Sequence, residues 1–329
     1  MQGNTVKQEA VYKKVSALVK DFLYESRLEN FDLDYICRNL GIQEAVNRKY
    51  VATVLSKMVK ADELEKRRGK YRFIDKEVKF VEWENAEVRP IEGLVYPYDV
   101  ERSDGFGFED YVILYPGDLI VIAGNSNAGK TAWCLNFLVN NMDKFKCRFI
   151  TNELGDKQKF KARISSFDWV DVLDKNGKGK FEVIKRYTSW QDIILPDAIN
   201  IVDWINLAGD RSYDIGMILQ SIQAKSPLLG VIAIQKSEGN PLGRGKDFSR
   251  DLASLYLTID YGKLTVVKCK SWEKDDPNNK MFGFRVVDRG SRFSDIYLAE
   301  NCPKCRGSRY IMGRKCDKCL GKGIIRKED

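Results

Sequence analysis

The strongest chemical signal in the chain is a G-x-x-x-x-G-K-T motif, formed by Gly124, Asn125, Ser126, Asn127, Ala128, Gly129, Lys130 and Thr131. A short apolar, β-branched run at 118–123 precedes it, and apolar residues at helical spacing follow over 132–142. A glycine turn between a strand and a helix aims backbone N–H groups at an anion, and the helix dipole adds to the attraction. The motif predicts a site for a nucleoside triphosphate such as ATP, with Lys130 on the β- and γ-phosphates and the Thr131 hydroxyl on Mg²⁺.

Polar side chains end three further strand-like runs, with Glu153 after 147–152, Asp203 after 199–202 and Gln235 after 229–234. Strand-like and helical stretches alternate here, which predicts an α/β fold whose parallel strands converge on the ligand at their carboxyl ends. Asp203 would bind Mg²⁺, Glu153 would deprotonate the attacking water and Gln235 would sense the γ-phosphate. A carboxylate is the available base because the chain has no histidine. The alternative is that each residue only caps a strand end.

The order of these motifs over residues 110–290 resembles that of the RecA-like P-loop ATPases, which include DnaB-type replicative helicases and the RecA and RadA recombinases. The resemblance implies a RecA-like core with a parallel-rich sheet. Glu153 matches the catalytic glutamate of that group, and Gln235 matches its γ-phosphate-sensing glutamine. The run 203–207 is similar to the helicase pattern of Asp, aromatic, apolar, polar, apolar.

Lys268 and Lys270 alternate with Cys269 near the end of the predicted core, so both lysines should lie on one face of a strand. A similar Lys-x-Lys in RecA-type filaments reaches a neighbouring subunit's γ-phosphate. The resemblance therefore implies a finger supplied in trans, and hence a homo-oligomer. The alternative is an exposed strand edge with solvated lysines.

The glycine-rich loop at 237–247 carries Arg244 and Lys246. In the RecA-like group the corresponding loop holds single-stranded DNA, so these two side chains are the candidates for contact with backbone phosphates. A solvated surface loop is the alternative. No function is assigned to residues 156–198, where basic residues indicate a helix and 174–180 a polar loop.

Two C-x-x-C knuckles, Cys302 with Cys305 and Cys316 with Cys319, are separated by ten residues. Two thiolate pairs at this spacing can close a tetrahedral zinc site, whereas two disulfides would be unusual in a reducing compartment. The flanking glycines resemble those of DnaJ-type zinc modules and small zinc ribbons. The four scattered cysteines, by contrast, lie in or beside apolar runs and are predicted to be buried thiols.

Residues 5–75 predict helices over 11–23, 33–40 and 46–59 and then a hairpin with a basic tip, which resembles a winged-helix domain. The resemblance implies that the third helix and the wing face duplex DNA. The candidate contacts are Arg48, Lys49, Arg67, Arg68 and Lys70. Winged helices also dock proteins, and that alternative stays open.

Composition bounds these interpretations. The 329-residue chain is 43% hydrophobic and 31% charged, as in a soluble globular protein. The formal charge of +8 is concentrated in residues 1–75 and 301–329, which suggests that these ends meet a polyanion; ordinary solvated lysines are the alternative. With no membrane-spanning run and no signal pattern, we expect a cytoplasmic location.

These observations together predict a winged helix at 1–75, a linker at 76–116, an ATPase core at 117–300 and a zinc ribbon at 301–329. The expected function is that of an oligomeric, DNA-associated ATPase motor using Mg²⁺, most similar to a replicative helicase. One alternative is a recombinase-like or regulatory ATPase that assembles on DNA without unwinding it. Another is a nucleotide-gated scaffold whose end modules bind proteins.

Overall fold

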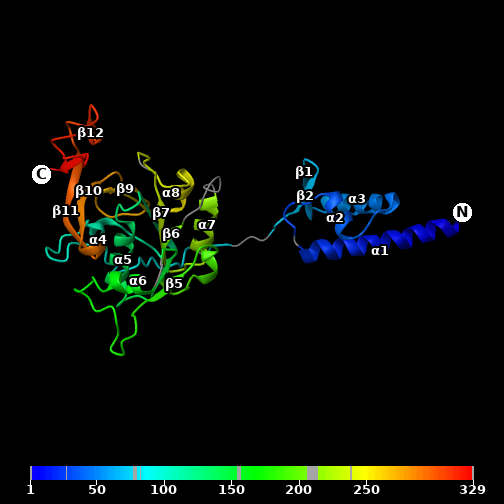
Figure 1. The fold of residues 1–329 in the computed structure, drawn as a ribbon. Coiled ribbons are helices and arrows are strands. Elements are labelled where there is room, and N and C mark those ends of the chain that lie inside the picture. Colours follow the sequence, from blue (N-terminus) through cyan, green and yellow to red (C-terminus); the bar gives the residue numbers. More distant parts are fainter. Residues whose placement is uncertain are drawn as a thin grey trace. The chain divides into compact units, whose positions relative to one another are not determined.

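The computed structural model describes residues 2–26, 28–76, 80–81, 83–153, 157–205, 214–237 and 239–327. The chain divides into two compact units, Met1–Ala86 and Glu87–Asp329 (Figure 1). In the described residues, no helix combines the length and the apolar character needed to cross a bilayer.

The first unit consists of three helices and a hairpin, as the sequence predicts: α1 (Gln2–Ser26), α2 (Leu33–Asn39), α3 (Ala45–Lys60), β1 (Leu64–Arg67) and β2 (Lys70–Phe73). The Asp32 side chain caps α2 by accepting from the backbone N–H of Tyr35 at 2.8 Å. Arg68 and Gly69, with φ of 50° and 82°, form a two-residue turn that places the hairpin tip in solvent. Apolar residues of all three helices pack with the hairpin in one core.

The second unit is built on a sheet that has ten strands in the described part of the chain, in the order β14-β11-β10-β9-β8-β3-β7-β6-β4-β5. From β8 to β5 neighbouring strands are parallel, whereas β9, β10, β11 and β14 extend the sheet by antiparallel pairing. The strands are β3 (Asp118–Gly124), β4 (Cys147–Thr151), β5 (Glu182–Lys185), β6 (Ile199–Ile205), β7 (Leu229–Gln235), β8 (Leu255–Asp260), β9 (Lys263–Cys269), β10 (Met281–Val287), β11 (Arg292–Asn301) and β14 (Ile324–Arg326). The predicted α/β core with a parallel-rich sheet is confirmed.

Helices cover both faces of this sheet (Figure 1). Alternate residues of β3 divide between two apolar clusters: Ile120 and Ile122 pack with α5, while Leu119 and Val121 pack with α7. The helical elements are α4 (Phe108–Tyr111), α5 (Lys130–Asn141), α6 (Lys157–Ile164), α7 (Asp214–Gln223) and α8 (Asp247–Leu252), with the short turns η1 (Trp190–Ile193) and η3 (Asp288–Gly290). Because β3 is covered on both faces, the loop that follows it starts from a rigid position.

Much of the predicted linker is part of the second unit, and here the structure differs from the sequence interpretation. Tyr96, Phe106 and Phe108 are at most 2% exposed, and their rings pack against one another and against Phe137 and Phe282. The prolines and glycines of 87–116 interrupt regular structure, but the aromatic side chains between them supply core.

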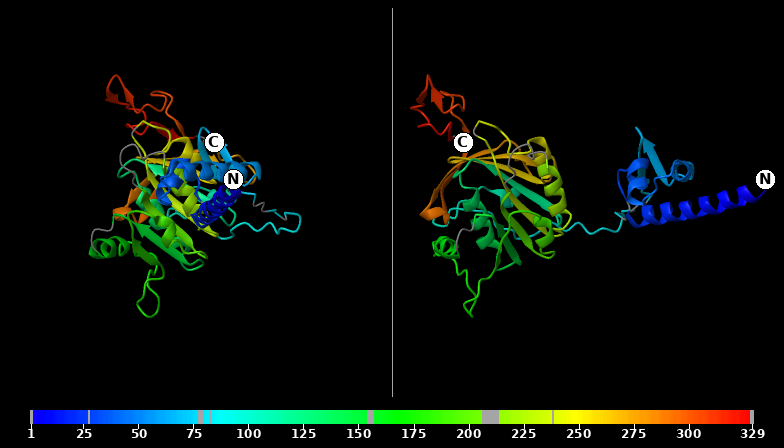
Figure 2. Two further views of the ribbon diagram at one scale, coloured as in Figure 1. Left: turned by 90° about the vertical axis from the view of Figure 1, so that its right-hand side faces the viewer. Right: turned by 45° about the vertical axis from the view of Figure 1, so that its right-hand side comes forward.

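The C-terminal segment stands at one end of the β10–β11 pair (Figure 2). It contains the small hairpin β12 (Tyr310–Ile311) and β13 (Arg314–Lys315), and it returns to the sheet through β14, which pairs with β11.

Candidate nucleotide site and four-cysteine centre

The loop after β3 has the backbone that its glycines predict. Gly129 is the N-cap of α5 and has φ of 112°, in a region that other residues rarely adopt. A Cβ on Gly124 would lie 2.8 Å from the Ile259 carbonyl oxygen and 2.8 Å from Cγ of Lys130. Glycine is therefore required where the lysine side chain crosses the end of the strand.

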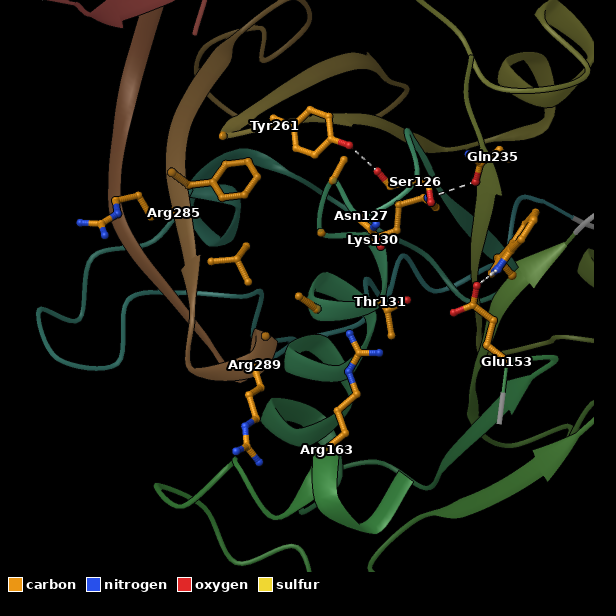
Figure 3. Close-up of a pocket in the computed structure, with 18 of the residues that line it drawn as sticks. Ser126, Asn127, Lys130, Thr131, Glu153, Arg163, Gln235, Tyr261, Arg285 and Arg289 are labelled. Carbon is orange, nitrogen blue, oxygen red and sulfur yellow. Dashed lines mark hydrogen bonds between the residues drawn. The ribbon is translucent and has the colours of Figure 1, made fainter. Parts of the chain in front are cut away.

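Lys130 lies folded along this loop and is 7% exposed. Its Nζ donates to the carbonyl oxygens of Gly124 at 3.0 Å and Asn125 at 2.8 Å, and to Oε1 of Gln235 at 3.4 Å (Figure 3). Burial lowers the pKa of Lys130, while the nearby Asp203 opposes that change. The ammonium group is thus held beside the anion site, against groups that a phosphate can replace.

Asp203 on β6 is 1% exposed and receives a hydrogen bond from Thr131. Burial raises its pKa from 3.8 to about 6, and the bond from Thr131 only partly offsets this. Among the described residues, its buried Oδ1 has no hydrogen-bond partner. An orphaned carboxylate oxygen next to a threonine hydroxyl fits Mg²⁺, which prefers oxygen ligands.

Glu153 lies just beyond β4 and is held by Trp204. The indole Nε1 donates to Oε1 of Glu153 at 2.6 Å, and the Asn152 amide donates to the Trp204 carbonyl at 2.8 Å. The remainder of the helicase-like run, Asn206 and Leu207, lies outside the described residues. The tryptophan thereby fixes the orientation of the carboxylate.

A cavity of 620 Å³ collects most of the predicted catalytic groups (Figure 3). Its wall includes the loop from Ser126 to Thr131, together with Glu153 and Gln235. Asp203 lines an adjoining cavity of 180 Å³ that shares Thr131 and Glu153 with the larger one. The topology thus brings together the groups that the sequence places at the ends of β3, β4, β6 and β7.

Several lining residues were not predicted. Arg163 on α6 points toward Thr131, and Arg289 comes from η3, so two cations flank the phosphate end of the cavity (Figure 3). Tyr261 donates its hydroxyl to the Ser126 carbonyl at 2.9 Å, and Phe284 lines the same wall. The basic run at 157–163 was the only sequence signal for any of them.

Lys268 and Lys270 do not line the cavity of their own chain. Lys268 Nζ donates to the backbone carbonyls of Arg250 at 3.0 Å and Asp251 at 2.7 Å, where α8 ends. Lys270 Nζ lies 3.5 Å from the Leu252 carbonyl. Both lysine side chains thus contact the end of α8, Lys270 lies just beyond β9, and Cys269 is buried.

The loop after β7 is described except for residue 238. A Cβ on Gly243 would lie 2.6 Å from the Ile234 side chain, so this glycine lets the loop pack on the sheet. The Arg244 backbone N–H donates to the Gln235 carbonyl at 2.8 Å, and the Lys246 side chain is exposed. The loop is therefore tied to the strand that carries Gln235.

The predicted contacts of the first unit differ in availability. Arg48 is paired with Asp34, whereas Lys49, Arg67 and Arg68 are exposed. Lys70 is exposed too, so four cations of this set face solvent.

The four C-terminal cysteines converge: their Sγ atoms all lie within 4.8 Å of one another, and all four residues are buried. Cys302 and Cys316 approach to 3.8 Å, and Cys305 and Cys319 to 3.6 Å. A tetrahedron of sulfurs about 2.3 Å from zinc has edges of about 3.8 Å, whereas a disulfide is about 2.05 Å long. The sulfur positions fit a zinc ion.

The two knuckles repeat one backbone conformation. Arg306 and Leu320 follow the second cysteine of each knuckle with φ of 50° and 52°, and the next residues, Gly307 and Gly321, have φ of 83° and 80°. The backbone N–H of Gly323 donates to Cys319 Sγ at 3.2 Å. Such bonds stabilise thiolate ligands.

No model of a known protein family matches the chain, and no curated protein matches it. Among solved structures, it is similar to a KaiC-like protein from the archaeon Pyrococcus horikoshii, with a TM-score of 0.45 and 14% identity, over 56% of this chain and 90% of that one. It is also similar to a RadB recombinase, with a TM-score of 0.40 and 15% identity, over 55% of this chain and 91% of the other.

Proposed function

We propose that this protein is a Mg²⁺-dependent ATPase of RecA-like fold that acts on DNA. The observation that carries the proposal is the convergence of Lys130, Thr131, Asp203, Glu153 and Gln235 at one edge of the sheet. A lysine, a threonine–aspartate pair and a positioned carboxylate are what phosphoryl transfer to water requires.

Each side chain has a definite task in this proposal. Thr131 and Asp203 hold Mg²⁺, which neutralises charge on the phosphate oxygens. Lys130 leaves the loop carbonyls to bind the β- and γ-phosphates. Glu153, oriented by Trp204, positions a water molecule and accepts its proton.

Glu153→Gln tests the hydrolytic role. Glutamine keeps an oxygen acceptor for the Trp204 indole but cannot take a proton, so we expect hydrolysis to fall by about 10²–10⁴-fold with nucleotide binding retained. Steady-state phosphate release and the binding of a fluorescent ATP analogue measure the two effects. A variant with the wild-type rate would rule out this base.

We infer a DNA partner from the loop after β7, whose Arg244 backbone is bonded to the Gln235 strand. A γ-phosphate that moves Gln235 would move the loop that carries Arg244 and Lys246. Single-stranded DNA should then stimulate hydrolysis several-fold. An unchanged rate would favour the nucleotide-gated scaffold.

Strand displacement separates the two DNA-dependent candidates. A replicative-type helicase unwinds a forked duplex, whereas a recombinase-like or regulatory ATPase assembles on the strand without displacing its complement. The charge of the exposed hairpin tip at Arg67 and Arg68 favours an additional contact with duplex DNA at the first unit.

The proposed homo-oligomer rests on Lys268 and Lys270 acting on a neighbour's nucleotide. Lys268→Ala should lower the hydrolysis rate, and Lys225→Ala provides a matched loss of one lysine at an exposed position that lines neither the nucleotide cavity nor the proposed DNA loop. If Lys268→Ala retains the full rate in the presence of DNA, the lysine only caps α8.

A further inference from the structure

A second cavity, of 700 Å³, lies between the core sheet and the C-terminal ribbon. We call it the ribbon groove. One wall comes from β8, β9, β10 and the loop after β7, and the other from residues 307–310. It shares no lining residue with the nucleotide cavity.

The ribbon groove carries excess positive charge at its base. Asp260 contacts three cations: Lys236 at 2.6 Å, Arg309 at 3.9 Å and Lys263 at 4.0 Å. Lys236 is 4% exposed, and Arg309 and Lys263 are 20% and 21% exposed. One carboxylate cannot balance three cations in a poorly hydrated site, so the arrangement favours an incoming anion.

Hydrogen bonding in the ribbon groove is incomplete. Lys236 also donates to the Asn240 carbonyl at 3.0 Å, but within the described residues the charged groups of Lys263 and Arg309 have no hydrogen bond. Asn125, which is 7% exposed, donates to Asp260 at 3.2 Å, while its own Oδ1 has no partner. The groove thus offers cationic donors for an anion and a buried acceptor for an N–H or O–H group.

We propose that the ribbon groove binds single-stranded nucleic acid. A backbone phosphate would lie at Lys263 and Arg309, and a base or sugar donor would reach Asn125. The ring of Tyr310, which is 51% exposed, lines the same groove and provides a stacking surface. Cations that follow a backbone and an aromatic platform are the two elements of sequence-tolerant binding of single strands.

Depth excludes duplex as the occupant. Duplex phosphates lie on the outside of a stiff rod and cannot reach cations that are about four-fifths covered. The groove also includes Gly239, Asn240 and Pro241 of the loop after β7, so one strand can contact both. The site extends the proposed DNA contact but is testable without hydrolysis.

The ribbon groove is connected to the nucleotide site through Asp260. Asn125 belongs to the phosphate loop, and Lys236 follows Gln235 directly and donates its backbone N–H to the Gly124 carbonyl at 2.9 Å. A nucleic-acid strand that draws Lys263 and Arg309 away from Asp260 therefore alters the contacts that Asp260 makes with Asn125 and with Lys236. Both of these residues are attached to the loop that holds Lys130. Binding at the two sites should be coupled and reciprocal.

The test is direct binding of fluorescein-labelled (dT)20, (dU)20 and (U)20, followed by anisotropy without nucleotide at several salt concentrations. We expect Lys263→Ala/Arg309→Ala to raise the Kd at least tenfold and to reduce the salt slope by about 1.4, because two phosphate contacts are lost. Arg314→Ala/Lys318→Ala removes the same charge from exposed ribbon positions outside the groove and should change the Kd less than threefold.

Equal losses in the two double variants would overturn the proposal, since binding would then follow net charge alone. A labelled duplex bound as tightly as (dT)20, with the same loss in the groove variant, would overturn the single-strand assignment. Comparison of (dU)20 with (U)20, which differ only in the 2′-hydroxyl, identifies the sugar preferred. Lys263→Gln and Arg309→Gln control for a folding defect. If each has the zinc content and the thermal unfolding temperature of wild type, its loss of binding does not come from misfolding.

Coupling is tested by adding a non-hydrolysable ATP analogue. It should shift the Kd for (dT)20 in wild type but not in Asp260→Asn. Because these measurements need no turnover, an inactive ATPase that still binds (dT)20 through the groove would refute the proposed hydrolysis and leave the groove in place.

Discussion

The nucleotide cavity and the four-cysteine ribbon are built in opposite ways. The cavity stands at the edge of a sheet covered on both faces by large apolar clusters. In the ribbon, the buried cluster consists of the four cysteines, with Ile311 and Ile325 packed against it. Apolar burial positions the first site before any ligand arrives, whereas we expect the second to depend on a bound metal for its fold.

The two regions nevertheless meet. Strand β14 joins the ribbon to β11, and Lys322, which lies between the knuckle glycines Gly321 and Gly323, lines the nucleotide cavity. A region that we expect to need a metal for its fold thus lines a cavity whose walls are otherwise held by the apolar core.

Loss of the metal should have the largest effect. Structural zinc supplies about 10–16 kcal/mol to small domains, more than the ribbon's few apolar contacts can replace. In Cys316→Ser we expect rapid hydrogen exchange over 302–327 and loss of bound zinc, while the core's Tm shifts by less than about 4 °C. Exchange mass spectrometry and metal analysis check this.

Cys147→Ser is the control, because it removes a buried thiol from the core and should leave the zinc content unchanged. If the ribbon of Cys316→Ser stays protected from hydrogen exchange without zinc, the ribbon does not need a metal to fold.

Replacement of Lys130 should hardly change the stability of the fold but should greatly lower the rate of hydrolysis. In Lys130→Met, the loop is still held by Gly124 and by the packing of β3, so nucleotide-free unfolding should change little. The hydrolysis rate should fall by about 10²–10³-fold, as when a preorganised donor to a developing charge is removed. Phosphate release and urea unfolding measure the two quantities, and a large loss of stability would mean that Lys130 is structural.

The sequence was informative where local spacing is sufficient. Glu153, Asp203 and Gln235 each follow an apolar strand, and parallel strands converge at their carboxyl ends, so their meeting could be predicted. The four-cysteine site could be predicted because the spacing of the cysteines from Cys302 to Cys319 is typical of a tetrahedral zinc site.

Residues that reach a site only through the connectivity of the sheet could not be predicted from local sequence spacing. Arg289 reaches the cavity only because β10 and β11 extend the sheet beyond the parallel strands. The three cations around Asp260 come from segments that are distant in sequence and that no short motif connects. Phe106 and Phe108 were hidden because glycines and prolines surround them.

Asp203 gives the core a pH dependence in the metal-free, nucleotide-free protein. Burial raises its pKa from 3.8 to about 6. The free-energy cost of burying the charged carboxylate is therefore absent below about pH 4 and complete above about pH 6. Stability from this group is therefore lost as the pH rises from about 4 to about 6, by up to about 3 kcal/mol. Asp203→Asn should become increasingly more stable than wild type over that range in urea unfolding.

Asp174→Asn provides a control of opposite sign. Backbone N–H groups of Lys178 and Asn176 lower the pKa of Asp174, so its contribution is present at neutral pH and lost as the pH falls. A flat difference between Asp203→Asn and wild type across this range would show that the carboxylate is not desolvated.

The smallest effect is expected where the two regions meet. Lys322 is exposed, so Lys322→Ala should weaken binding of a fluorescent ATP analogue only about two- to fourfold, in the range of about 0.5–1 kcal/mol for a solvated charge. Lys318→Ala, in the same ribbon but outside the cavity, should have no effect. Chelation of zinc should reproduce the loss in wild type but add little in Lys322→Ala, because contributions through one contact are not additive. If chelation weakens nucleotide binding equally in wild type and in Lys322→Ala, the ribbon influences the nucleotide through β14 and β11 rather than through this lysine. The nucleotide cavity would then depend on the metal more than its apolar walls suggest.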